Sequence, residues 1–150
     1  GAAAIIMIEQ TPFRREFAKQ WSDHVFDIPE FFSLPSFPVD VVIESSGYLN
    51  NVENIFRWIN ANGRVVLLAR SGDSLSLTSV DHMITNEISI VGSRGHLGGI
   101  YSRTLKLYKR GILPLKAIVT QVVDGLDGLE NILRNPSIIN SNNCKVMVHF

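Results

Sequence analysis

Two charged side chains near the start of the chain could bind a nucleoside. Glu9 follows the apolar run 2–8 and precedes Thr11-Pro12, which is typical of the start of a helix. A carboxylate at the end of a strand can accept hydrogen bonds from both hydroxyls of a ribose, and it repels a 2′-phosphate. An ordinary carboxylate at a helix N-terminus explains Glu9 equally well. Arg14 could lay its guanidinium plane over an adenine, or it could be a solvated surface residue.

Small residues follow three apolar runs farther along the chain. They are Ser45-Ser46-Gly47, Ala69-Arg70-Ser71-Gly72 and Gly92-Ser93-Arg94-Gly95. Ligands of open parallel sheets bind beyond the carboxyl ends of the strands, where small residues let a ligand approach the backbone. Any one of these segments could be a plain strand-to-loop exit. Three of them together favour a shared ligand cleft.

Other kinds of chemistry lack support. No G-x-G-x-x-G precedes the first expected helix, and neither a P-loop nor G-x-S-x-G occurs. The four histidines and Cys144 are scattered without metal-ligand spacing. The adjacent pairs Asp23-His24 and Asp81-His82 diverge on either a helix or a strand. We therefore predict no catalytic residue and no metal site.

The elements that would position these residues alternate between strands and helices. Apolar runs predict strands at Ala2–Ile8, His24–Asp27, Val39–Glu44, Arg64–Ala69, Ile88–Val91, Ile118–Val123 and Lys145–Phe150. Periodic spacing predicts helices from Thr11, over Leu49–Ala61 with a stop at Asn62-Gly63, and over Ser79–Asn86, Gly98–Arg110 and Asp124–Leu133. We interpret 28–38 as a loop or one irregular helical turn. The alternation predicts an α/β fold with a mostly parallel sheet flanked by helices.

Three of the expected helices carry apolar side chains on one face. The first carries Phe13, Phe17 and Trp21, and the last carries Leu126, Leu129, Ile132 and Leu133 on its inward face. The helix over Leu49–Ala61 carries Val52, Ile55, Phe56 and Ile59 at helical spacing.

Composition limits the class of protein. The 150 residues are 45% hydrophobic and 19% charged, which suits one globular domain. The formal net charge is zero, which predicts no nucleic-acid partner, and no apolar stretch approaches the length of a membrane span. The single cysteine excludes an intrachain disulfide and favours a reducing, cytoplasmic location.

Four runs of the chain form an ordered set of motifs, namely Asp40–Gly47, Asn62–Leu68, Ile88–Gly95 and Gly111–Thr120. In order and spacing this set resembles the zinc-type medium-chain alcohol and polyol dehydrogenases. Asp40–Gly47 resembles the family's D-V-V-I-E-x-S/T-G strand, Asn62–Leu68 its G-G-R-V-V-L-V-G, and Ile88–Gly95 its I-x-G-S-x-R. Gly111–Thr120 resembles G-x-I-x-x-x-x-L-I-T. The family pattern D-x-x-x-x-R-x-x-x-A-K-x-x-G-A-D-H-V is matched near the start of the chain by Glu9, Arg14, Ala18-Lys19 and Asp23-His24-Val25. The order of these motifs holds across nearly the whole chain.

The resemblance implies roles for individual residues. Glu9 would hold the adenosine ribose, so that NAD is favoured over NADP, and Arg14 would flank the adenine. Ser46 and Gly47 would line the cleft. The residues beside the nicotinamide half would be Leu68, Ala69 and Arg70, with Ser93, Arg94 and Gly95 near its carboxamide. The family usually has Gly at the position of Ala69, and Gly-Ala at the position of Trp21-Ser22.

The same resemblance implies what the chain lacks. Residues 1–150 would be a partial Rossmann domain without its first βα unit, and the catalytic zinc would belong to a GroES-like domain outside this chain. We therefore expect a cofactor-binding fragment of an NAD-dependent alcohol or polyol dehydrogenase, inactive by itself. The alternative is a non-catalytic α/β module acting in dimerisation or protein interaction. Under either hypothesis we expect a homo-oligomer formed through a sheet edge near Ser74–Thr78.

Overall fold

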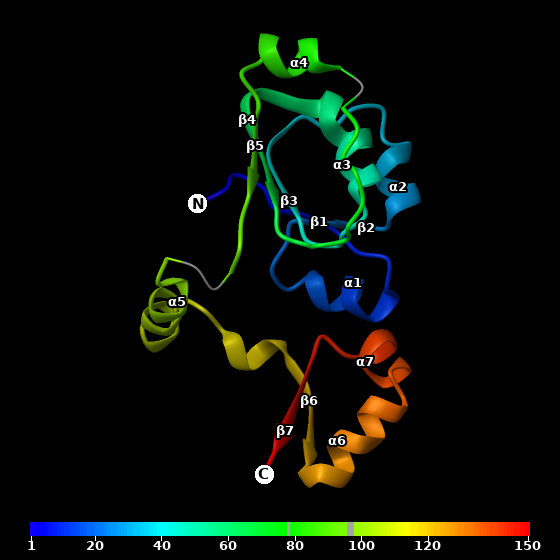
Figure 1. Ribbon diagram of the computed structural model, residues 1–150, viewed down its shortest axis with the longest axis vertical. Coiled ribbons are helices and arrows are strands. Elements are labelled where there is room, and N and C mark those ends of the chain that lie inside the picture. Colours follow the sequence, from blue (N-terminus) through cyan, green and yellow to red (C-terminus); the bar gives the residue numbers. More distant parts are fainter. Residues whose placement is uncertain (78, 96–97) are drawn as a thin grey trace. The chain divides into compact units, whose positions relative to one another are not determined.

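The computed structural model describes residues 1–77, 79–95 and 98–150, and these fall into two units. Unit 1 combines Gly1–Ser33 with Thr104–Phe150, and unit 2 is the continuous segment Leu34–Arg103. All strand pairs of the described residues are parallel, and helices connect the strands (Figure 1). The expected α/β class is therefore confirmed.

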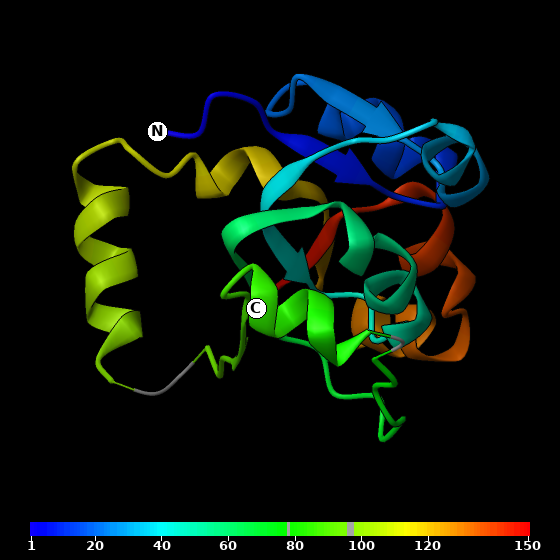
Figure 2. The same cartoon turned by 90° about the horizontal axis from the view of Figure 1, so that it is seen from above.

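The first part of unit 1 is a small strand–helix–strand arrangement. Strand β1 (Ile6–Ile8) pairs with β2 (His24–Phe26), and the two blue arrows run side by side in Figure 2. Between them lies α1 (Pro12–Ala18), which begins at the expected proline. Helix α2 (Ile28–Ser33) follows β2, so the segment expected as a loop or single turn is in part a short helix.

Aromatic rings extend along one side of α1 and into the turn after it; Phe13 and Phe17 lie on the helix as the sequence predicts, whereas Trp21 lies beyond its end at Ala18. The rings of Phe13 and Phe17 are stacked with centroids 6.3 Å apart, and Trp21 meets Phe17 edge-on at 4.7 Å. Such aromatic contacts add to the stabilisation that burial alone provides.

The second part of unit 1 holds another parallel pair. Helix α5 (Ile100–Lys109) is followed by Gly111 at φ +71°, and a 3₁₀ turn η2 (Leu115–Ile118) leads into β6 (Val119–Asp124). Helices α6 (Gly125–Arg134) and α7 (Ser137–Asn142) then connect β6 to its partner β7 (Lys145–His149). Helix α7 was not predicted.

The predicted inward face of α6 is wrong at two of its four positions. Ile132 is buried and Leu129 is half-buried, but Leu126 and Leu133 are 71% and 69% exposed. A Cβ at Gly128 would lie 3.0 Å from Val123 Cβ, so the face that approaches β6 is the one centred on Gly128. At about 100° of rotation per residue, Leu126 and Leu133 lie on nearly the opposite side of α6 from Gly128.

Unit 2 is a three-stranded sheet with helices α3 (Leu49–Ile55) and α4 (Val80–Thr85). Its strand order is β3 (Val39–Glu44), β4 (Ile59–Leu67), β5 (Ser89–Gly92). The buried core is formed by one cluster of five residues, namely Val52, Phe56, Ile59, Val65 and Ile88. Ser79 caps α4 as expected, because its Oγ accepts a hydrogen bond from His82 N at 3.2 Å.

The helix expected over Leu49–Ala61 ends six residues early. A 3₁₀ turn η1 (Phe56–Trp58) follows α3, and Ile59 already pairs with Val39 as the first residue of β4. Asn62, at φ +62°, lies in an irregular part of that strand, and its N donates to Asn86 O at 2.7 Å. The predicted helix stop is thus an irregularity of β4.

The sheet of unit 2 is covered on one face only. Val39 and Val42 pack against the core cluster, whereas Val41 and Ile43 are 58% and 64% exposed. The apolar run 39–44 predicts a buried strand, and this prediction is wrong for the outer face of β3. The strand predicted over Ala2–Ile8 is shorter than expected, because β1 begins at Ile6. Among the described residues, no helix has the length and apolar character needed to cross a membrane.

Candidate functional site

The carboxyl ends of the three strands of unit 2 lie at one edge of the sheet. Glu44, Leu67 and Gly92 are neighbours in register across β3, β4 and β5. Beyond this row, Leu68 N donates to Glu44 O at 2.8 Å and Ser93 N donates to Leu67 O at 2.9 Å. The three small-residue exits therefore start side by side, as the sequence predicts for a shared ligand edge.

Glu44 organises the first of these exits. Its side chain is only 5% exposed, and its Oε1 accepts hydrogen bonds from Ser46 N at 2.7 Å, Ser46 Oγ at 2.6 Å and Gly47 N at 2.8 Å. Ser46 Oγ in turn accepts from Tyr48 N at 3.2 Å. The other carboxylate oxygen, Oε2, is buried and has no hydrogen-bond partner among the described residues.

The turn formed by Ser45–Gly47, called the 45–47 turn below, lies against the second small-residue segment, Ala69–Gly72. Gly47 has φ +86°, a conformation that favours glycine. A Cβ at this position would be 3.4 Å from Ser71 Cβ and 3.8 Å from Ala69 Cβ. The structure thus brings Gly47 close to Ala69 and Ser71, while the predicted role of these residues in a shared cleft stays a prediction.

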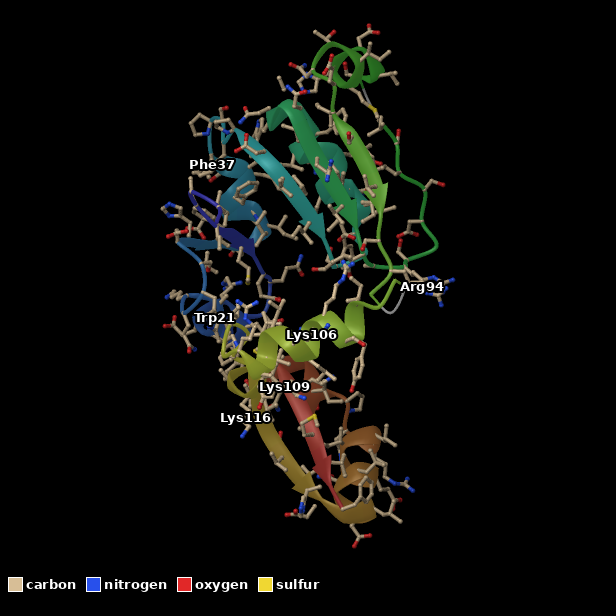
Figure 3. All side chains as sticks on the ribbon, turned by 90° about the vertical axis from the view of Figure 1, so that its left-hand side faces the viewer. Trp21, Phe37, Arg94, Lys106, Lys109 and Lys116 are labelled. Atoms are coloured by element: carbon tan, nitrogen blue, oxygen red, sulfur yellow. The ribbon has the colours of Figure 1, made fainter. Side chains whose placement is uncertain are left out.

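The remaining predicted residues of unit 2 lie on the exits from β4 and β5. Leu68, Arg70, Ser93, Arg94 and Gly95 are exposed. Figure 3 shows Arg94 on the segment that leaves the end of β5. The contacts predicted between these residues and a nicotinamide remain predictions.

Glu9 lies at the carboxyl end of β1 in unit 1. Its backbone N donates to Phe26 O at 3.0 Å, which extends the β1–β2 pairing by one residue. Its Oε1 accepts a hydrogen bond from Thr11 N at 2.8 Å, immediately before α1. Glu9 therefore makes a hydrogen bond at the start of α1, as expected of a carboxylate at a helix N-terminus. It also lies at the end of a strand, as expected of a residue that binds a ribose.

Arg14 connects α1 to the end of α7. Its Nε donates to Asn143 O at 3.0 Å and one terminal nitrogen donates to Ile139 O at 3.2 Å. Cations are favourable near a helix C-terminus, where carbonyl groups lack partners. Neither of the two interpretations of Arg14 anticipated this contact, and its adenine role remains a prediction.

A buried asparagine, Asn143, stabilises the loop between α7 and β7. Asn143 is 7% exposed; its amide nitrogen donates to Gln121 Oε1 and Ile138 O, and its Oδ1 accepts from Thr120 Oγ1. The next residue, Cys144, is a free thiol. Burial raises the pKa of the Cys144 thiol, Arg14 lowers it and Glu9 raises it.

Sequence reasoning missed Glu44 and Asn143 as organising residues. Glu44 had a usable signal, because an acidic residue that ends an apolar strand must find donors or solvent. Asn143 belongs to a polar run, Asn140–Asn143, that resembles any exposed loop. Nothing in that pattern marks Asn143 as buried.

The described residues do not form a metal site. No group of three His, Cys, Asp or Glu side chains within 1–77, 79–95 and 98–150 is placed to hold a metal ion. A surface hollow lies on α1, lined by Phe13, Glu16, Phe17, Lys19 and Gln20.

A model of the zinc-binding dehydrogenase family matches residues 1–110. The chain belongs to this family. The fold agrees with those of solved dehydrogenases. A short chain alcohol dehydrogenase from E. coli CFT073, complexed with NADH, superposes with a TM-score of 0.83 at 16% identity over 99% of this chain and 45% of its own.

Two further solved structures have the same fold. L-idonate 5-dehydrogenase from Escherichia coli K-12 gives a TM-score of 0.80 at 21% identity, covering 100% of this chain and 44% of that one. S. aureus TarJ in complex with NADPH gives 0.75 at 14%, covering 98% and 48%. The chain thus spans less than half the length of each of these structures. No curated protein matches it in sequence.

Proposed function

We propose that the chain is the cofactor-binding domain of an NAD-dependent alcohol or polyol dehydrogenase. The observation that carries the proposal is the shared edge of three strand ends in unit 2, in a chain whose family is that of the zinc-binding dehydrogenases. The bound cofactor would exchange a hydride with the substrate carbon. Ser46, Gly47, Ala69 and Ser93 would form the surface against which the nicotinamide half lies.

We propose that Glu9 selects NAD over NADP. One of its oxygens accepts from Thr11 N, and the carboxylate keeps a second oxygen for the ribose hydroxyls. A negative charge at that place disfavours a 2′-phosphate. The relatives support either cofactor, since one solved structure holds NADH and another NADPH. The preference therefore rests on Glu9, with Arg14 proposed beside the adenine.

A titration of the 150-residue chain with NADH and with NADPH tests this proposal. We expect weak binding, and NADH to bind more tightly than NADPH. Glu9→Gln should bring the two dissociation constants closer, because it removes the charge that opposes the 2′-phosphate. Equal affinities in the wild-type chain would contradict the role of Glu9, and no binding of either nucleotide at millimolar concentration would contradict the proposed function.

We do not place the zinc on this chain. The described residues offer no ligand set for it, so the family's metal would have to be held by residues other than these. The proposal for this chain is limited to binding and orienting the cofactor.

We place the protein in the cytoplasm, because the thiol of Cys144 is free; fractionation of cells expressing a tagged chain tests this location.

We also propose that the chain self-associates, as the alternative function in dimerisation requires. The exposed outer face of β3, with Val41 at 58% and Ile43 at 64%, favours association because isolated apolar sheet faces are rarely left in water. The segment Ser74–Thr78 is the other candidate surface; Ser74–Leu77 belong to no strand, and Thr78 lies outside the described residues. Sedimentation should give a dimer for the wild type and a monomer for Ile43→Lys. A monomeric wild type would contradict this proposal.

A further inference from the structure

Glu44 is the one buried acidic side chain among the described residues, and it lies at the edge proposed to bind the cofactor. All of its side-chain hydrogen bonds go to the 45–47 turn through Oε1, while Oε2 has no partner. Charged acceptors form stronger hydrogen bonds than neutral ones. A carboxylate that shared its bonds between both oxygens would be more favourable, because a buried oxygen without a donor is costly.

The contacts fix the turn in one position. Glu44 O is bonded to Leu68 N, so the backbone of this residue is fixed to β4 while its side chain holds the turn. Gly47 in turn lies against Ala69 and Ser71. Glu44 therefore fixes the position of the 45–47 turn relative to the segment Ala69–Gly72, which follows β4.

We infer that Glu44 is a positioning residue for the nicotinamide end of the cofactor. It shapes the edge by holding Ser46 and Gly47, and its charge favours the oxidised ring. The oxidised nicotinamide is cationic and the reduced ring is neutral, whereas the rest of the nucleotide is the same in both. A negative charge beneath the edge therefore stabilises NAD⁺ relative to NADH. This inference rests on the proposed function.

The first test does not depend on the cofactor. Hydrogen exchange is measured by NMR on the full chain and on Glu44→Gln, which keeps the side-chain size. The amides of Ser46 and Gly47 should exchange about tenfold faster in the variant, since a neutral amide oxygen is a weaker acceptor. Val65 N–H, in the middle of β4, is the internal reference and should change little.

Glu53→Gln is the matched control. Glu53 also accepts a backbone hydrogen bond through one oxygen, from Ser76 N at 2.6 Å, but this contact is not made with the 45–47 turn. It should leave the exchange of Ser46 and Gly47 unchanged. Unaltered exchange at both amides in Glu44→Gln would overturn the positioning role, whether or not the chain binds a nucleotide.

The second test measures NAD⁺ and NADH dissociation constants for the same variants. Glu44→Gln should weaken NAD⁺ more than NADH, changing their ratio by about threefold or more, because it removes a charge near the ring. A simple structural loss would weaken both equally, and that outcome would overturn the electrostatic role. If the wild type bound neither nucleotide, the proposed function would fail and the exchange experiment would still decide the positioning role.

Discussion

Replacing Asn143 with alanine should destabilise unit 1 strongly. The asparagine is 7% exposed and makes three side-chain hydrogen bonds, to Gln121 Oε1 at 2.9 Å, Ile138 O at 2.7 Å and from Thr120 Oγ1 at 2.9 Å. At about 1 kcal/mol for each bond, the substitution should cost about 3 kcal/mol of unfolding free energy. The loss is large because the substitution leaves three partners without their hydrogen bond.

Asn135→Ala is the matched control. Asn135 also uses its amide nitrogen twice, to Asn131 O and Asn131 Oδ1, but it is exposed and water can replace both bonds. Its substitution should change the unfolding free energy by about 0.5 kcal/mol or less.

Urea unfolding of both variants, followed by circular dichroism, gives the comparison. With a slope of about 2 kcal/mol/M, Asn143→Ala should lower the midpoint by about 1.5 M. Hydrogen exchange by mass spectrometry should localise the faster exchange to β6 and β7. If the two variants lowered the midpoint equally, the network around Asn143 would not stabilise the loop as argued.

Three further outcomes are expected. Gly63→Ala should destabilise unit 2 by about 2 kcal/mol or more, because the added Cβ would collide with Ile59 Cγ2 and lie 2.8 Å from Asn60 O; thermal unfolding checks this. Cys144 should react with iodoacetamide more slowly than free cysteine at pH 8, since its raised pKa leaves less thiolate, and Arg14→Ala should slow it further. A rate equal to that of free cysteine would contradict this. The pure chain should not reduce NAD⁺ with any alcohol, since we propose that it only binds and orients the cofactor; measurable NADH formation would disprove that.

The order of elements could be predicted because each strand is a distinct apolar run. The strands at 39–44 and 88–91 and the helix near 100–110 lie close to their expected bounds. The boundary at Ile59 could not be found in the same way. Its spacing from Val52 and Ile55 continues a helical face, and only its pairing with Val39 makes it the start of a strand.

The candidate site was predictable in outline and not in detail. Small residues after apolar strands predicted Ser46, Gly47 and Ala69 near one another, and Gly47 does lie beside Ala69. Which polar atoms pair could not be read from the sequence, because pairing depends on side-chain direction. Arg14 illustrates this point, since its two carbonyl partners lie 125 and 129 residues farther along the chain.

The long separation between Arg14 and its partners has a consequence for how the protein is made. Unit 2 is a continuous segment, so all of its strands are translated before the second part of unit 1. At about 5–20 residues per second, the 33 residues that open unit 1 wait several seconds for β6, α7 and β7. During that interval the carbonyl groups that bind Arg14 do not yet exist. Unit 1 is therefore completed after unit 2, and until then helix α1 lacks the contacts that Arg14 makes with the end of α7.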